Sequence, residues 1–407
     1  MVDVLIIGAG PAGSVAAALL TRKGYRVLVL EKQRFPRFSI GESLLANSME
    51  FLAEAGMLEA VMSHSFQFKN GASFVHGARE SQFNFAEKSS SGFAFTFQVQ
   101  RADFDKLLAD EAARQGAEVR FEVEITAVDF SRPTPRVTSK AADGTVEVHE
   151  ARFVLDASGF GRTLPRLLDL DRPSDFPVRS ALFTQIRDGI VSGAFDRQKI
   201  RIGVHPTEPT VWSWLIPFSN GISSLGFVAT REFHAKFKGS NEERLQQLIA
   251  QEPRLEELVG TVETVRPVGE ITGYAAKVTR MHGPGFALLG NAAEFLDPVF
   301  SSGVTIAMQS ASLAAKVLDR QFKGETVDWD REFVEPLNFG VETFRSYVAG
   351  WYDTSLQDVI FFERPEPSIK RMICSVLAGY VWDRANPYCG LQSSRRLRAL
   401  AQACRNG

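Results

Sequence analysis

The 407-residue sequence predicts an α/β fold in which a parallel-sheet domain is interrupted by an antiparallel sheet and followed by helices. Short, fully apolar runs at residues 4–7, 27–30 and 286–289 are typical of strands buried on both faces of a parallel sheet. Residues 71–85 alternate apolar and polar side chains, as antiparallel strands do. Beyond about residue 330 the pattern favours helices.

The first unit of the chain is a strand, a glycine-rich loop and a helix. Residues 4–7 form the strand, residues 8–13 read Gly-Ala-Gly-Pro-Ala-Gly, and the small residues of 11–22 predict the helix. A second apolar strand, 27–30, ends at Glu31. This order of elements is the opening βαβ unit of a Rossmann-like domain.

Each glycine of the loop has its own task in a dinucleotide site. Gly8 permits the tight turn, Gly10 lets the backbone approach a pyrophosphate, and Gly13 lets the helix pack closely on the strand. The helix N-terminus offers free N–H groups and positive potential to the phosphates. Glu31, about 20 residues further on, can accept hydrogen bonds from ribose hydroxyls. Two neighbours complete the expected cofactor contacts: Ala12 and Lys32.

The apolar strands before and after the alternating segments predict a discontinuous nucleotide-binding domain. The alternating segments predict an inserted antiparallel sheet domain for the substrate, with one helix near residues 242–250. Other expected elements are a helix at 102–115, strands at 119–130 and 151–156, and a helix at 304–318. The expected division is 1–65, 98–170 and 271–330 for the nucleotide domain, 66–97 and 171–270 for the sheet domain, and 331–407 for the helical region.

Composition and charge narrow the classes of function. Hydrophobic residues make up 44% and charged residues 23%, which is typical of a globular enzyme, and the net charge of −2 gives no reason to expect nucleic acid. No apolar run approaches the roughly 20 residues of a membrane helix, and no signal peptide opens the chain, so a cytoplasmic location is expected. Cys374, Cys389 and Cys404 lack metal-binding spacing, so neither a disulfide framework nor a metal site is predicted.

Two later motifs resemble those of the FAD-dependent hydroxylase superfamily. Residues 156–159 read Asp-Ala-Ser-Gly and residues 290–293 read Gly-Asn-Ala-Ala, like its second and third FAD signatures, and Arg101 matches its flavin-contacting arginine at a helix start. The resemblance implies FAD as the cofactor and a hydroxylase-like form of the Rossmann-like fold. Asn291 stands where the family has Asp, which implies weaker flavin binding. The cofactor contacts implied here are Arg101, Asp156, Gly159, Gly290 and Asn291.

Further motifs resemble those of flavin-dependent halogenases. Residues 212–217 read Trp-Ser-Trp-Leu-Ile-Pro, residues 295–303 follow the pattern Phe-x-x-Pro-x-x-Ser-x-Gly, and Lys69 lies in a Lys-Asn-Gly-Ala context like the family's essential lysine. Residues 41–45 resemble the flavin strap of these enzymes. Without the resemblance, 212–217 is an amphipathic strand and Lys69 is a solvated turn residue.

The halogenase resemblance assigns a role to each of these residues. Catalytic roles fall to Lys69, Trp212, Trp214, Ile216, Pro217, Phe295 and Ser301; flavin contacts to Gly41, Glu42, Ser43, Pro298, Gly303 and Val304; and halide binding to Ser302 and Gly303.

The implied activity uses reduced FAD, oxygen and chloride or bromide to make hypohalous acid. Backbone N–H groups at a helix start near Ser302 and Gly303 would bind the halide. The Lys69 ammonium would polarise the halogen toward an electron-rich carbon, while the two tryptophans would keep the substrate away from the flavin. Phe300 stands where tryptophan halogenases carry Glu, so the implied substrate is a phenolic or pyrrolic aromatic, free or tethered to an acyl carrier protein.

Two other activities of the superfamily stay open at the level of sequence. One is an FAD-dependent aromatic monooxygenase, and the other is a flavin reductase without halogenating activity. Lys69, Trp212 and Trp214 together favour the halogenase. No second strand–glycine loop–helix unit follows in the sequence, so we expect a separate flavin reductase to supply FADH2. The basic segment 395–398 suits an acidic carrier domain or simply a solvated helix face.

Overall fold

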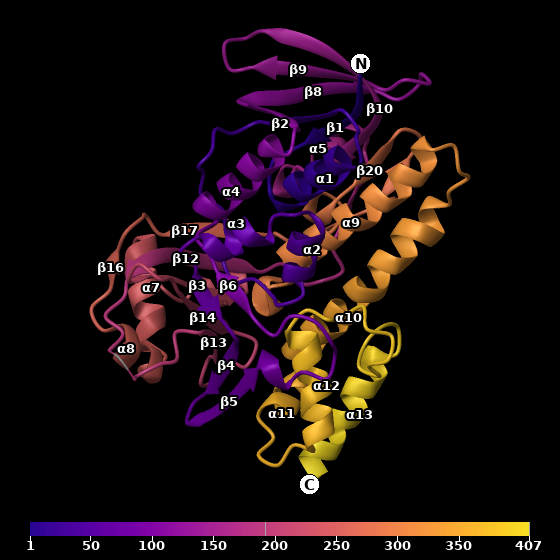
Figure 1. Ribbon diagram of the computed structural model, residues 1–407. Helices are drawn as coiled ribbons and strands as arrows, with labels where there is room; N and C mark the ends of the chain where they lie inside the picture. Colours follow the sequence, from indigo (N-terminus) through magenta and orange to yellow (C-terminus); the bar gives the residue numbers. More distant parts are fainter. Residues whose placement is uncertain (192, 407) are drawn as a thin grey trace.

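Two eight-stranded sheets organise the computed structural model, which describes residues 1–191 and 193–406 (Figure 1). The first sheet has the order β19-β20-β10-β1-β2-β7, and β8 and β9 extend it beyond β10. Its strands are β1 (Val2–Ile7), β2 (Val27–Glu31), β7 (Glu118–Phe121), β8 (Val123–Asp129), β9 (Arg136–Ala141), β10 (Val146–Asp156), β19 (His282–Gly283) and β20 (Phe286–Leu288).

The central strands β20, β10, β1, β2 and β7 are parallel, as the apolar runs of β1, β2 and β20 predict. The single strand expected at 119–130 is wrong. Glu122 has a left-handed φ of 62° and divides the segment, so that β7 pairs with β2 while β8 turns away to pair with β9. Strand β10 is also longer than expected, because its first half pairs with β9.

The second sheet has the order β16-β12-β15-β14-β13-β4-β5, with β17 also paired to β12. It is antiparallel as expected, except that β13 and β4 run parallel. Its strands are β4 (Gly71–His76), β5 (Arg79–Asn84), β12 (Ser180–Arg187), β13 (Lys199–Val204), β14 (Trp212–Pro217), β15 (Ile222–Ala229), β16 (Glu263–Thr264) and β17 (Gly269–Thr272). Two further ribbons are β3 (Gln67–Lys69) with β6 (Thr96–Gln98), and β11 (Asp171–Pro173) with β18 (Ala276–Val278).

Helices cover both sheets and form the C-terminal region at the end of the molecule opposite β8 and β9 (Figure 1). They are α1 (Pro11–Arg22), α2 (Ser48–Glu54), α3 (Leu58–Ser63), α4 (Arg101–Arg114), α5 (Thr163–Leu167), α6 (Arg231–His234), α7 (Asn241–Ala250), α8 (Pro253–Val259), α9 (Ser302–Phe322), α10 (Glu335–Tyr352), α11 (Ser355–Ile360), α12 (Pro367–Leu377) and α13 (Ser393–Asn406). The expectation of one helix near 242–250 is therefore incomplete, since α6 and α8 flank α7. Among the described residues, no helix is both long enough and apolar enough to cross a membrane.

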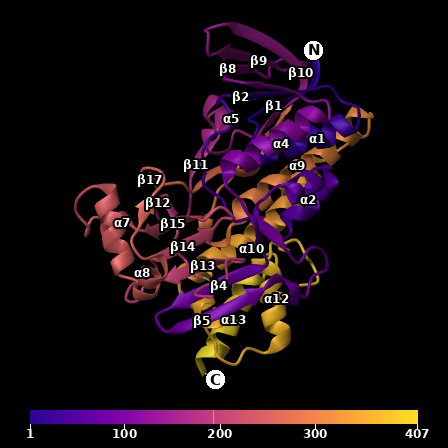
Figure 2. The ribbon, with the colours of Figure 1, turned by 60° about the vertical axis from the view of Figure 1, so that its left-hand side comes forward.

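The alternation along β14 separates two cores. Leu215 packs with Leu225, Phe227 and the apolar face of α7 and α8 on one side of the second sheet. Trp212 and Trp214 belong to the large core on the other side, which is shared with α1, α9 and α10. Figure 2 shows α7 and α8 on one side of this sheet and α10 on the other. Because successive side chains of a strand point to opposite faces of the sheet, Trp212 and Trp214 both point toward the nucleotide-binding sheet.

Close packing of α1 on β1 depends on two glycines. A Cβ at Gly13 would lie 1.9 Å from the carbonyl oxygen of Gly8. Gly8 itself has a φ of +96°, and a Cβ there would lie 2.7 Å from the carbonyl oxygen of Ala157 at the end of β10. Only glycine lets these three backbones approach one another.

We expect Gly13→Ala to destabilise the fold, because its Cβ cannot be placed without moving α1 or the loop. The flavin-free protein should lose about 3 kcal/mol or more of unfolding free energy, seen as a lower Tm or insoluble expression. Gly10→Ala is the matched control, since Gly10 has a φ of −68° and its Cβ would meet only the Arg37 guanidinium at 3.7 Å. Equal stability of the two variants would contradict the steric argument.

Candidate active site

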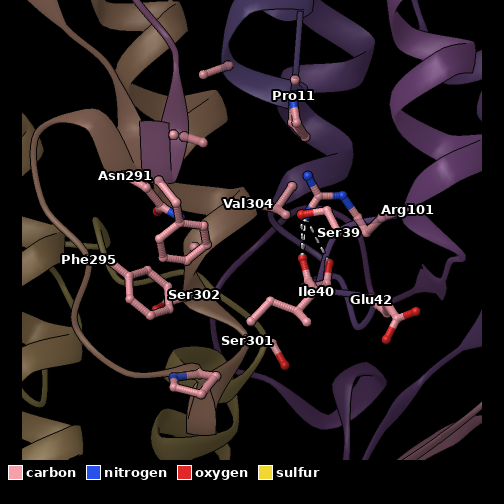
Figure 3. Close-up of a pocket in the computed structure, with 18 of the residues that line it drawn as sticks. Pro11, Ser39, Ile40, Glu42, Arg101, Asn291, Phe295, Ser301, Ser302 and Val304 are labelled. Atoms are coloured by element: carbon pink, nitrogen blue, oxygen red, sulfur yellow. Dashed lines mark hydrogen bonds between the residues drawn. The ribbon is translucent and has the colours of Figure 1, made fainter. Parts of the chain in front are cut away.

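One cavity extends from the glycine loop to the Trp-x-Trp strand (Figure 3). Pro11 lies at one end and Ser301 at the other, with Asn291 and Phe295 along one side and Ile40, Glu42 and Arg101 along the other (Figure 3). The sequence-predicted residues that line it are Gly10, Ala12, Glu31, Gly41, Glu42, Ser43, Arg101, Gly159, Trp212, Trp214, Ile216, Asn291, Phe295, Pro298, Ser301, Ser302, Gly303 and Val304.

The other sequence-predicted residues lie outside this wall. Gly8 and Gly13 pack beneath the loop, and Gly290 packs against Ala307. Lys32 is exposed, and its ammonium pairs with Glu124 at 2.6 Å. The remaining three are Lys69, Asp156 and Pro217, and the first two support residues that do line the cavity.

The loop end of the cavity fits a dinucleotide pyrophosphate. Helix α1 begins there without a side-chain cap, so its first N–H groups are directed at the cavity. The carboxylate of Glu31 accepts hydrogen bonds from the backbone N–H of Ala9 at 2.9 Å and of Gln33 at 2.9 Å. Glu31 thereby fixes the loop, and its oxygens keep lone pairs for a ribose hydroxyl.

Arg101 holds the strap, residues 41–45, through the backbone just before it. Its Nη1 donates to the carbonyl oxygen of Ile40 at 2.8 Å, while Nε and Nη2 form a two-pronged ion pair with Asp105 at 2.7 and 2.8 Å. The backbone N–H of Val99 donates to the carbonyl oxygen of Glu42 at 2.7 Å. The strap is therefore fixed against the start of α4, with Arg101 itself facing the cavity.

The Glu42 carboxylate is a buried acid in the cavity wall. Gln185 Nε2 donates to its Oε1 at 2.5 Å, and the Ser224 hydroxyl also hydrogen-bonds to it. Burial raises the pKa of Glu42 to about 7, although these hydrogen bonds and the charges of Arg101 and Arg266 favour the ionised form. Glu42 can thus exchange a proton near neutral pH.

Lys69 is buried directly behind the strap. Its Nζ donates to Ser43 Oγ and to the carbonyl oxygen of Leu44, both at 2.7 Å, and lies 5.4 Å from the centre of the Phe85 ring. Only 1% of the residue is exposed, so the solvated-turn alternative is excluded. Burial lowers the pKa of Lys69 to about 7. Among the described residues, no carboxylate pairs with the ammonium to oppose this effect.

The halide loop, residues 295–303, turns the chain sharply into α9. Pro298–Phe300 form a short 3-10 turn, and Ser301 has a left-handed φ of 55°. This conformation is strained for serine and starts α9 at Ser302. The first turn of α9 carries no acidic residue and no side-chain cap, so its N–H groups are free to hydrogen-bond to an anion.

The second and third FAD signatures act partly through the backbone. Asp156 is fully buried and accepts from the N–H of Ser158 at 2.8 Å and of Leu164 at 2.6 Å, which holds the turn that presents Gly159 to the cavity. Arg162 Nη1 donates to the carbonyl oxygen of Asn291 at 3.1 Å, leaving the Asn291 side chain toward the cavity.

Several wall or support residues were not predicted. Arg37 lines the cavity, and its Nη1 pairs with Asp105 at 2.9 Å. A cation in the Phe-Pro-Arg-Phe loop shortly after Glu31 was a usable signal for it. No signal in the sequence pointed to Gln185 or Arg162, because they reach the site from segments that are distant in sequence.

These donor sets fit FAD. The uncapped N-termini of two long helices, α1 and α9, open on the same cavity, and Arg37 and Arg101 add cationic side chains to its wall. A pyrophosphate suits the first terminus, and the flavin end would lie toward the halide loop. The described residues contain no cluster of His, Cys, Asp and Glu arranged for a metal ion.

Burial of Lys69 gives the stability of the protein a pH dependence. Its pKa falls from 10.5 to about 7 on folding, so between these values the unfolded chain binds a proton that the folded chain does not. The free energy of unfolding should therefore rise with pH in this range by up to about 1.4 kcal/mol per unit. Denaturant unfolding of Lys69→Met across this pH range should show a smaller slope than that of the parent protein. An unchanged slope in Lys69→Met would mean that Lys69 stays protonated when folded.

Residues 1–330 match a family model described as an FAD binding domain. A chlorinase of 1H-pyrrole-2-carbonyl peptidyl-carrier protein from Pseudomonas fluorescens is 29% identical over 93% of this chain and 89% of its own length. Tryptophan 2-halogenase from Chondromyces crocatus is 30% identical over 79% of this chain and 62% of its own length. The solved structure of a flavoprotein/dehydrogenase from Cytophaga hutchinsonii is 47% identical, covers 100% of this chain and 99% of that one, and superposes with a TM-score of 0.96.

The family match covers most of the chain, and the glycine loop, the uncapped helix termini and the strap fall within it. The protein therefore belongs to the FAD-binding domain family and, within it, to the flavin-dependent halogenases.

Proposed function

We propose that this halogenase acts on a phenolic or pyrrolic aromatic, free or bound to a carrier protein. Reduced FAD, delivered by a separate flavin reductase, would activate oxygen. The activated oxygen would then oxidise chloride or bromide to hypohalous acid. The observation that carries the proposal is Lys69: a buried amine without a carboxylate partner among the described residues, set directly behind the strap of the cavity.

The halide loop provides the anion site in this proposal. The N–H groups of Ser302 and Gly303 begin a 21-residue helix and carry its positive end. A Cβ at Gly303 would lie 3.3 Å from the Phe295 ring, so glycine keeps that ring close to the site. Phe295 and the helix terminus border the part of the cavity that we assign to the halide ion.

Lys69 is placed to act on halogen that passes the strap. Ser43 lines the cavity and accepts a hydrogen bond from Lys69 Nζ, so the amine lies one side chain away from the cavity. As an ammonium it would donate a hydrogen bond to the oxygen of hypohalous acid, and as a free amine it would form an N–halogen bond while the O–halogen bond breaks and water leaves. A pKa of about 7 makes both forms accessible at neutral pH.

Phe300 supports an electron-rich substrate. It is buried, and its ring packs edge-on against Tyr347 at a centroid distance of 6.1 Å. No carboxylate stands at this position to activate a substrate, and a phenol or pyrrole needs none. The named activity of the Pseudomonas fluorescens relative, chlorination of a carrier-bound pyrrole, supports the same class.

One assay tests the function. Purified protein is supplied with a flavin reductase, NADH, FAD, oxygen and bromide, and is offered simple phenols and a pyrrole carried on a peptidyl-carrier protein. Products with hydrogen replaced by bromine support the proposal. Products that gain one oxygen instead indicate a monooxygenase, and oxidation of NADH by the protein and FAD without the added flavin reductase indicates a reductase.

Lys69→Ala should lower halogenation at least about 100-fold, because it removes the donor that acts on the halogen. Binding of FAD, measured by fluorescence, should weaken less than tenfold, roughly the effect of losing two hydrogen bonds to the strap. Ser43→Ala is the matched control, since it removes one of these bonds but keeps the amine. Full halogenation by Lys69→Ala would exclude the role of Lys69.

Asn291→Asp should bind FAD several-fold more tightly, since a charged acceptor makes stronger hydrogen bonds to ribityl hydroxyls. The same charge lies near the start of α9, because Asn291 Oδ1 would be 3.7 Å from a Cβ at Gly303. The KM for bromide should therefore rise. Fluorescence titration and steady-state kinetics give the two values, and a lower bromide KM would contradict the placement of the halide.

A further inference from the structure

The two tryptophans of the Trp-x-Trp motif lie side by side on β14 but direct their indole N–H groups to different partners. Their ring centres are 5.8 Å apart, and both side chains are buried in the cavity wall. Trp212 Nε1 donates to the Tyr352 hydroxyl at 3.0 Å, and Trp214 Nε1 donates to the Ser224 hydroxyl at 3.0 Å. A barrier between flavin and substrate needs the bulk of these rings but not their N–H groups.

The Trp212 bond continues to the halide loop. Tyr352 donates onward to Asp297 Oδ2 at 2.8 Å, and Tyr274 donates to the same oxygen at 3.2 Å. Asp297 Oδ1 accepts from the backbone N–H of Val299 at 3.0 Å, which shapes the turn before Ser301. Because indole is a donor only, the direction of this chain is fixed from Trp212 through Tyr352 to Asp297.

The Trp214 bond leads toward the strap. Ser224 accepts from Trp214 and lies on β15, beside the strand β12 that carries Gln185. Gln185 lies directly opposite Ser224 in the β12–β15 register and donates to Glu42 Oε1. Strand β12 thus holds the buried carboxylate of the strap beside the residue that bonds to Trp214.

We propose that Trp212 and Trp214 are positioning residues that tie the two functional walls of the cavity to β14, Trp212 holding the halide loop and Trp214 holding the strap. The names of these walls rest on the proposed function. The tethers explain why the motif uses tryptophan at both positions, since phenylalanine would fill similar space without an N–H donor. Each tether should therefore affect the binding of a different ligand: the Trp212 tether affects halide binding, and the Trp214 tether affects flavin binding.

Single Trp→Phe variants of the FAD-loaded protein test the proposal. Trp212→Phe should weaken bromide binding about fivefold and leave the Kd for FAD within about twofold, while Trp214→Phe should do the reverse. Bromide is titrated against the absorbance of bound flavin, and FAD by fluorescence. Trp329→Phe is the matched control, because it loses an indole bond to Gln321 of 2.8 Å outside the cavity wall and should change neither value.

A double-mutant cycle separates a tether from a loss of packing. Tyr352→Phe should weaken bromide binding less in the Trp212→Phe background than in the parent protein, because only its bond to Asp297 is then left to lose, and Ser224→Ala should likewise weaken FAD binding less with Trp214→Phe. Additive effects, or equal losses of both ligands in both variants, would overturn the proposal. These affinities do not depend on turnover. If the protein fails to halogenate, but Trp212→Phe weakens only bromide binding and Trp214→Phe weakens only FAD binding, the proposed tethers are still supported. If the protein halogenates but the two variants do not differ in this way, the tethers are excluded.

Discussion

The contact between Gly8 and Gly13 is the constraint on which the cavity depends. A Cβ at Gly13 would lie 1.9 Å from the Gly8 carbonyl, so α1 can approach β1 and β10 only through backbone atoms. This approach fixes the direction of α1, and its N-terminus then opens on the same space as the N-terminus of α9. Two helix termini of the same polarity would repel each other without an anion between them. A bound pyrophosphate and a halide would each supply such an anion.

Buried titratable groups lie in the strap, behind it and in the halide loop. Lys69 and Glu42 both have pKa values of about 7, and Asp297 has its pKa raised to about 6, in each case first through burial. None of the three forms an ion pair within hydrogen-bonding distance among the described residues. Hydrogen bonds to hydroxyl, amide and backbone groups hold them instead, which fixes their positions while leaving their charges adjustable. A site that handles halide, oxygen and protons at neutral pH benefits from such groups.

Local patterns predicted most of the α/β order, because apolar runs, alternation and the glycine loop are set by near neighbours. They failed where a single residue redirects the chain. Glu122 splits one expected strand into two with different partners, and the turn at Ser301 lets α9 begin at Ser302, two residues before the expected start at Val304. Both adopt left-handed conformations that their residue types do not announce. Short helices such as α2 and α8 were also missed, since their stability comes from packing rather than from a long amphipathic pattern.

The sequence by itself determined the nucleotide loop, its helix, the family resemblance and the two rows of side chains on β14, because spacing alone directs them. Only the tertiary structure decided what Lys69 does. Its sequence context favours an exposed turn, and burial behind Ser43 turned it into an amine of low pKa. The links from Trp212 through Tyr352 to Asp297 and from Gln185 to Glu42 were likewise decided by folding. They join residues far apart in the chain, and side-chain pairs at such separations depend on packing geometry that no local pattern encodes.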